Sequence, residues 1–186
     1  MANHVTTTVE VVSDNPMVFD KLKEWFDGKE WDTLSDTMFL YNILYPEAGG
    51  TYDRGEYTDR MGAKWAYIED YEIDDTYFVM HTTSAWYFIE DAIDRMGQIL
   101  NQIDEKVLLK FTFEDESLDP IGGGAWYKGE MDFDERSYEW PDEDELSEEE
   151  YDNEMDSLYE NVHSICEEFM NDAVSFLLDN ESDEEE

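Results

Sequence analysis

Residues 106–133, KVLLKFTFEDESLDPIGGGAWYKGEMDF, contain the strongest fold signal in the chain. From Lys106 to Glu114, apolar and polar residues alternate, which is typical of a strand with one buried face. The three glycines at 122–124 predict a turn, and the aromatic residues from Trp126 to Phe133 predict a last pair of strands after it. We therefore expect an antiparallel sheet.

Upstream of this stretch, the pattern predicts alternating strands and helices. Residues 5–12 alternate as a strand, and Asn15 and Pro16 are a cap and a first residue for a helix that stops at Gly28. A second apolar stretch covers residues 39–45, whereas the polar residues 51–60 predict a loop.

Two more strands and a second helix complete the expected order. Residues 64–73 and 76–82 read as paired strands, and Ser84 predicts the cap of a helix from Trp86 to Ile103. The order β-α-β-β-α-β-β favours an α+β fold over residues 1–136, with a ferredoxin-like antiparallel sheet and two helices on one face.

The distribution of charge divides the chain after Arg136. The net charge is −40, from 51 acidic and 11 basic residues, and residues 137–186 hold 21 of the acids and no Lys or Arg. Ser147 and Glu150 form a capping box, after which apolar residues recur every three or four positions. We predict a long acidic amphipathic helix that packs on the sheet domain and frays over residues 179–186.

Composition narrows the classes of function. Because 41% of the residues are hydrophobic, the chain should fold despite its charge. Direct contact with phosphates or anionic membranes is disfavoured, since both require clustered basic residues. With one cysteine, no signal-peptide pattern and no apolar run of 18 residues, we expect a soluble, cytoplasmic protein.

Several short motifs resemble a known family over residues 1–135. They are Asn3 with the Thr-rich strand 6–12, the apolar strand 39–46 ending in proline, Gly62, Lys64 and Trp65, the segment 83–86, and the glycine-aromatic turn 122–130. Together they resemble the YubB-like family, a ferredoxin-fold domain of unknown function carried by bacteriophages and conjugative plasmids. The proline pair expected after Trp86 is replaced here by Tyr87 and Phe88. The resemblance implies the fold and a mobile-element origin, and assigns no catalytic residues.

Enzyme templates are missing from the sequence. No nucleophile elbow, P-loop or dinucleotide-binding glycine motif occurs, so we expect no enzymatic activity, no cofactor and no catalytic residue.

Metal binding is also not expected. His163 and Cys166 lie three residues apart, but a zinc site needs two more ligands, and only His4 and His81 remain; packing of Cys166 in the helix core explains the pair better. Asp132 and Asp134 begin like a calcium loop that Arg136 and Ser137 interrupt. The tryptophans Trp65, Trp86 and Trp126 suggest a base-stacking platform, but the charge favours core packing.

The uncompensated acids of residues 137–186 are the feature that needs a functional explanation. If helical, the segment would carry about one charge per 3.6 Å, close to the phosphate spacing of about 3.4 Å along one DNA strand. We therefore expect a nucleic-acid mimic that binds and inhibits or sequesters a basic nucleic-acid-binding protein of the host, such as a defence or DNA-transaction enzyme. The predicted partner-binding residues are Glu143, Glu145, Glu148, Glu149, Asp152, Asp156 and Glu160.

Two alternatives remain open at this point. The acidity could be an adaptation to salt, or a device for solubility, in a phage domain of another function. Alternatively, the chain could be a structural homo-oligomer, a homodimer in the simplest case, joined through Phe169, Phe176 and Leu177 of the last helix.

Overall fold

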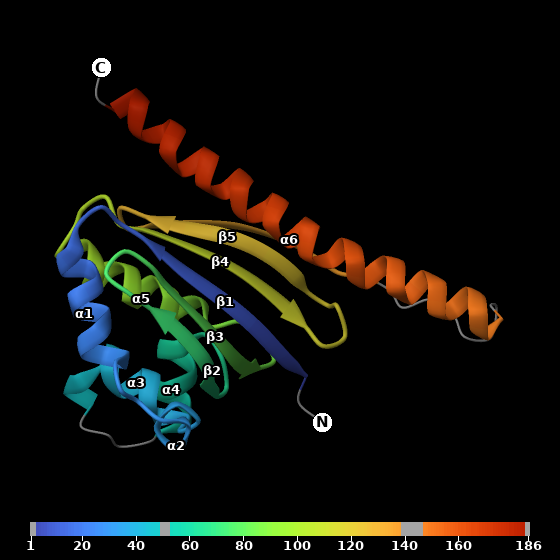
Figure 1. Ribbon diagram of the computed structural model, residues 1–186, viewed down its shortest axis with the longest axis horizontal. Helices are drawn as coiled ribbons and strands as arrows, with labels where there is room; N and C mark the ends of the chain where they lie inside the picture. Colours follow the sequence, from blue (N-terminus) through green and yellow to red (C-terminus); the bar gives the residue numbers. More distant parts are fainter. Residues whose placement is uncertain (1–2, 49–52, 139–146, 185–186) are drawn as a thin grey trace.

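The centre of the computed structural model is a six-stranded antiparallel sheet with the order β2-β3-β1-β4-β5-β6 (Figure 1). The structure describes residues 3–48, 53–138 and 147–184. The strands are β1 (His4–Val12), β2 (Ala66–Ile73), β3 (Phe78–Ala85), β4 (Leu108–Asp115), β5 (Ile121–Tyr127) and β6 (Glu130–Arg136). The mixed α+β class and the antiparallel sheet are confirmed.

Helices form a layer on one face of this sheet, and one long helix crosses the other face (Figure 1). The first layer holds α1 (Pro16–Phe26), α2 (Trp31–Leu34), α3 (Met38–Leu44), the short 3-10 helix η1 (Pro46–Ala48), α4 (Arg54–Met61) and α5 (Glu90–Asn101). The long helix is α6 (Glu148–Glu184). More helices than the expected pair therefore cover the first face.

Alternation along β1 separates the two faces. Val5, Val9 and Val11 are buried in the core beneath the helical layer, whereas the even-numbered residues point to the opposite face. As predicted, α1 begins at Pro16, and the Asn15 side chain accepts a hydrogen bond from the Met17 amide at 3.1 Å.

Two segments between β1 and β2 are helices where we expected a strand and a loop. The apolar residues of 39–46 are buried at helical spacing in α3, and most of the polar segment 51–60 belongs to α4. Asp53 caps α4 by accepting from the Glu56 amide at 3.0 Å. The rings of Tyr41 and Tyr57 stack 5.2 Å apart, so the two helices gain their stability from each other, which local patterning does not reveal.

The second long helix of the sheet domain starts later than predicted. Ser84 lies in β3, where its hydroxyl donates to the Tyr87 carbonyl at 2.8 Å, and α5 begins only at Glu90. Trp86 has a positive φ of 77° between the two elements. A Ser residue before an apolar run is also typical of a helix cap, so the sequence alone did not distinguish a cap from the hydrogen bond to a backbone carbonyl that forms here.

The glycines at 122–124 lie inside β5, and the turn is formed by Lys128 and Gly129 instead. A Cβ at Gly122 would fall 2.4 Å from the Phe113 ring, and one at Gly124 would fall 2.3 Å from Phe133 Cβ. On the opposite face, a Cβ at Gly123 would fall 2.2 Å from the Cys166 carbonyl oxygen of α6. Because the three glycines lack side chains, aromatic rings can approach β5 from one face and α6 can approach it from the other.

Helix α6 packs on β4, β5 and β6 through an apolar stripe. Its buried residues Val162 and Cys166 contact Ile121, and Ala173 and Leu177 contact Ala125 and Tyr127. The predicted capping box is present, because the Glu150 amide donates to Ser147 Oγ at 3.4 Å and the Ser147 amide donates to Glu150 Oε2 at 3.1 Å.

The end of α6 differs from our expectation of fraying from residue 179. The helix continues to Glu184, and residues 185–186 lie outside the described part of the chain. Within the described ranges, none of the helices is both long enough and apolar enough to cross a membrane.

Replacing Gly123 with alanine should loosen α6. The added methyl group has to displace the helix backbone, which we expect to lower the free energy of unfolding by about 1–3 kcal/mol. Urea denaturation measures this loss, and labelling of the buried Cys166 by a thiol reagent measures release of the helix. Gly55→Ala is the matched control, because a Cβ there would meet only Asp53 Oδ1, at 3.4 Å. Equal labelling rates in wild type and Gly123→Ala would contradict this account.

Candidate partner-binding surface

One flank of α6 forms a continuous acidic stripe. Glu149, Asp152, Asp156, Glu160 and Glu167 are exposed, and spacings of three, four or seven residues place them on the same side of the helix. We call this set the acidic flank. Fourteen acidic residues and no Lys or Arg occur within α6, so nothing on the helix itself compensates this charge.

The structure brings four of the seven predicted contact residues together in the acidic flank: Glu149, Asp152, Asp156 and Glu160. Glu148 is the first residue of α6. Glu143 and Glu145 lie outside the described residues. The sequence analysis missed Glu167, although its spacing from Glu160 and His163 was the signal that could have identified it.

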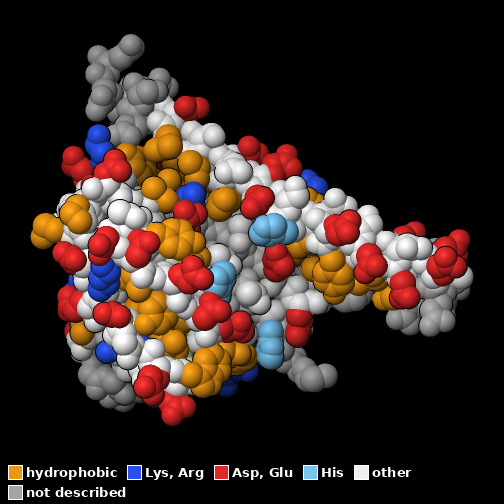
Figure 2. Space-filling view, in the orientation of Figure 1, with side chains coloured by type: hydrophobic (Ala, Val, Ile, Leu, Met, Phe, Trp, Pro, Cys, Tyr) orange, Lys and Arg blue, Asp and Glu red, His pale blue; other side chains and the backbone are white. Residues whose placement is uncertain are grey.

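Whereas the first turns of α6 extend past the strands, the Glu167 end of the acidic flank borders the part of the sheet that α6 leaves uncovered (Figure 1). This open face consists of the outward residues of β1, β2 and β3 and of the adjoining residues of β4. Figure 2 shows red carboxylates along α6 and over the sheet, with the pale blue histidines between them. Register places Thr6, Thr8 and Glu10 of β1 beside Thr83, His81 and Val79 of β3.

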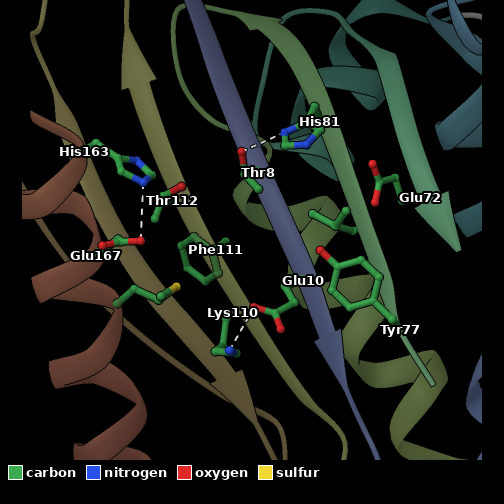
Figure 3. Close-up of a pocket in the computed structure, with 12 residues that line it drawn as sticks. Thr8, Glu10, Glu72, Tyr77, His81, Lys110, Phe111, Thr112, His163 and Glu167 are labelled. Carbon is green, nitrogen blue, oxygen red and sulfur yellow. Dashed lines mark hydrogen bonds and ion pairs between the residues drawn. The ribbon is translucent and has the colours of Figure 1, made fainter. Parts of the chain in front are cut away.

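A groove of about 320 Å³ lies where the acidic flank meets the open face (Figure 3). Its floor includes Thr8 and Glu10 from β1, His81 from β3 and Lys110 from β4, and its wall includes Glu167 from α6. The groove therefore joins residues more than 150 positions apart in the sequence.

Interactions within the groove leave an acidic lining. Lys110 is the only Lys or Arg among the lining residues, and its Nζ lies 2.8 Å from Glu10 Oε2. His81 Nδ1 and Thr8 Oγ1 share a hydrogen bond of 3.0 Å, and His163 Nε2 lies 3.3 Å from Glu167 Oε1. With Lys110 neutralised, a cationic group of a partner is the complement of this groove.

Glu114 is a half-buried carboxylate between β4 and α6. Burial raises its pKa above the ordinary value of 4.5, and the nearby His163 partly counteracts that rise. Because the folded protein favours the protonated form, ionisation of Glu114 opposes docking of α6.

Packing places Cys166 and the histidines in different environments. Cys166 is fully buried, its Sγ lies 3.7 Å from the Phe113 carbonyl oxygen, and burial raises its pKa to about 12. His163 is on the exposed flank and His4 packs on Trp65. Asp132 and Asp134 lie on strand β6 and not in a loop. Across the described ranges, no three His, Cys, Asp or Glu side chains are arranged to hold a metal ion.

The three tryptophans singled out in the sequence have different environments. Trp126 is buried and its indole nitrogen donates to Asp94 at 2.8 Å. Trp65 is half-buried, and Trp86 is 56% exposed, so the expectation of core packing is wrong for Trp86.

The apolar residues expected to join two copies are largely used within the chain. Leu177 is buried against the sheet, and Arg136 lies over the Phe169 ring at 5.6 Å. Phe176 is 54% exposed. Of the three residues, Leu177 is therefore unavailable to a second copy, Phe169 is half-buried and Phe176 remains on the surface.

Comparisons with known proteins give one fold-level similarity. No family model and no curated protein matches the chain. The crystal structure of a protein api92 from Yersinia pseudotuberculosis, of family model DUF1281, is similar with a TM-score of 0.47 and 6% sequence identity. The similarity covers 76% of this chain and 100% of that chain.

Substitution Glu114→Gln should stabilise the protein in a pH-dependent way. The carboxylate has a raised pKa in the folded state, so its contribution to stability is present at low pH and is lost as the pH rises through that pKa. The glutamine amide cannot ionise, so the variant does not lose this stability as the pH rises. We expect a higher urea midpoint than wild type at pH 7 and no difference near pH 4.

Glu116→Gln is the control for this substitution, because Glu116 is exposed on the following turn and should show no such pH-dependent gain. A Glu114→Gln variant less stable than wild type at pH 7 would show that the carboxylate makes a favourable interaction in the folded state.

Proposed function

We propose that this chain is an acidic nucleic-acid mimic that binds a basic nucleic-acid-binding protein of the host and inhibits or sequesters it. The acidic flank carries the proposal. Helix α6 has 37 residues, or a length of about 55 Å, and the fourteen acids on all its sides, of which the flank holds five, give about one charge per 4 Å. Along one DNA strand, the phosphates are about 3.4 Å apart.

Rigidity makes this similarity useful for binding. A flexible acidic tail loses conformational entropy when it binds, whereas α6 is a continuous helix held to the sheet domain by the packing of its residues 158–177. A basic cleft that accepts α6 releases counterions from the helix as it would from DNA. Affinity should therefore depend strongly on salt.

The fold and the resemblance described above support a mobile-element setting. We infer that β1 to β4 form a ferredoxin-like core, since they follow the order β4-β1-β3-β2, with β5, β6 and α6 as additions. The resemblance to the YubB-like family of phages and plasmids agrees with this core. The partner would then be a defence or DNA-transaction protein in the cytoplasm of the host cell.

Neutralising the acidic flank should weaken partner binding without unfolding the protein. We expect the variant Glu149→Gln/Asp152→Asn/Asp156→Asn/Glu160→Gln to bind about tenfold or more weakly, with the slope of log K against log salt reduced by up to about 4. The measurement is retention of DNA-binding proteins from nuclease-treated lysate at about 0.1 M salt, with elution by duplex DNA.

The matched control removes the same number of charges from the other side of α6, as Glu154→Gln/Glu168→Gln/Asp172→Asn/Asp179→Asn. It should retain partners as wild type does. Retention of no DNA-binding protein, or retention that ignores salt and DNA, would contradict the proposal. A wild-type protein that folds only near 2 M salt would be a salt-adapted protein instead.

A further inference from the structure

A row of aromatic side chains crosses one end of the open face. The rings of Trp65, which directly precedes β2, and of Tyr67 on β2 lie 6.0 Å apart and within 11° of parallel. Trp31 meets Tyr67 edge-on at 6.4 Å, and His4 meets Trp65 edge-on at 5.4 Å. We call these four residues the aromatic row. Trp31 belongs to α2 of the helical layer and is 56% exposed beside the edge strand β2, whereas Trp65 and Tyr67 are half-buried, so a partner reaches the row from the β2 edge of the sheet.

Elsewhere in the molecule, several aromatic rings have a Lys or Arg side chain of the protein over them. Six described cations lie over rings at 4.1–5.6 Å: Lys21, Arg60, Lys64, Arg95, Lys128 and Arg136. Lys64 lies 4.1 Å from the Trp86 ring centroid, although it is the neighbour of Trp65. In the described part of the chain, no Lys or Arg lies over Trp31, Trp65 or Tyr67.

Carboxylates continue the aromatic row along β2. A bulge between Ile68 and Asp70 breaks the register with β3 and adds a residue to the outward face. Glu69 accepts a hydrogen bond from Thr83, and the side chain of Asp70 is 72% exposed. Glu72 follows on the same face and lines the groove. One edge strand thus presents aromatic rings and then acids.

This combination selects a particular cation. A guanidinium group is planar, stacks on aromatic rings and binds carboxylates through two parallel hydrogen bonds, whereas the lysine ammonium group is a compact, strongly hydrated charge. Outward side chains on β2 recur about every 7 Å, which is also the repeat of alternate side chains in an extended peptide.

We propose that the aromatic row and the β2 carboxylates bind arginine side chains of an extended basic segment of the partner. This inference rests on the proposed function and names the partner chemistry that the open face recognises. The acidic flank supplies attraction to any cation, and the aromatic row supplies the preference for arginine over lysine.

Octa-arginine and octa-lysine peptides test this proposal, because their charges are equal and only their side-chain chemistry differs. Titration calorimetry with the full chain at about 0.1 M salt should show about fivefold tighter binding of octa-arginine. Trp31→Ala should weaken octa-arginine binding about threefold and leave octa-lysine binding unchanged.

Trp86→Ala is the matched control, since Trp86 is exposed to the same 56% but its ring already carries Lys64. It should keep the wild-type preference, and Trp65→Phe, which retains a ring, should keep most of it. The flank variant should weaken both peptides equally.

Several outcomes would overturn the assignment. Equal affinity of wild type for the two peptides removes the arginine preference while leaving the mimic proposal intact. An unchanged ratio in Trp31→Ala does the same. Tight binding of oligo-dT would identify the row as a base-stacking platform and would contradict the mimic proposal as well. Binding of neither peptide, with no DNA-binding protein retained from lysate, would reject the mimic proposal as well.

Discussion

Helix α6 lies against strand β5 at a distance that only glycine permits, because a Cβ at Gly123 would fall 2.2 Å from the Cys166 carbonyl oxygen. This close approach brings Val162 and Cys166 onto Ile121, and Ala173 and Leu177 onto Ala125 and Tyr127. Packing of apolar groups must outweigh repulsion between the acids of α6 and those of the sheet domain, since the helix has no cation of its own. The acidic flank, the groove and the open face all take their positions from this contact.

Helix α6 covers only part of the sheet face that lies opposite the helical layer. The helix covers β5 and β6, whereas Thr6 of β1 and the carboxylates of β2 stay exposed, with the half-buried rings of Trp65 and Tyr67 beside them. Charge and aromatic surface therefore occur together on one side of the molecule. A surface of uniform acidity would attract cations of any kind; in the mode of binding that we propose, the aromatic rings add a preference by shape.

Local patterns in the sequence predicted the strands, α1 and the apolar stripe of α6, because each depends on residues within a few positions of one another. They failed where tertiary contacts decide the structure. Most of the segment 39–46 lies in helix α3, where Tyr41 packs on the distant Tyr57, and glycines 122–124 lie in a strand approached closely by rings on one face and a helix on the other. The acidic flank followed from helical spacing. The groove and the aromatic row did not, because strand register sets them and register joins distant residues.

The two edges of the sheet carry like charges. Strand β2 presents Glu69, Asp70 and Glu72 at one edge, and β6 presents Glu130, Asp132 and Asp134 at the other. Edge strands can pair with further chains and extend a sheet into aggregates, but a second copy added here would place carboxylates opposite carboxylates. Carboxylates at both edges thus oppose the edge-to-edge pairing of two copies of the sheet.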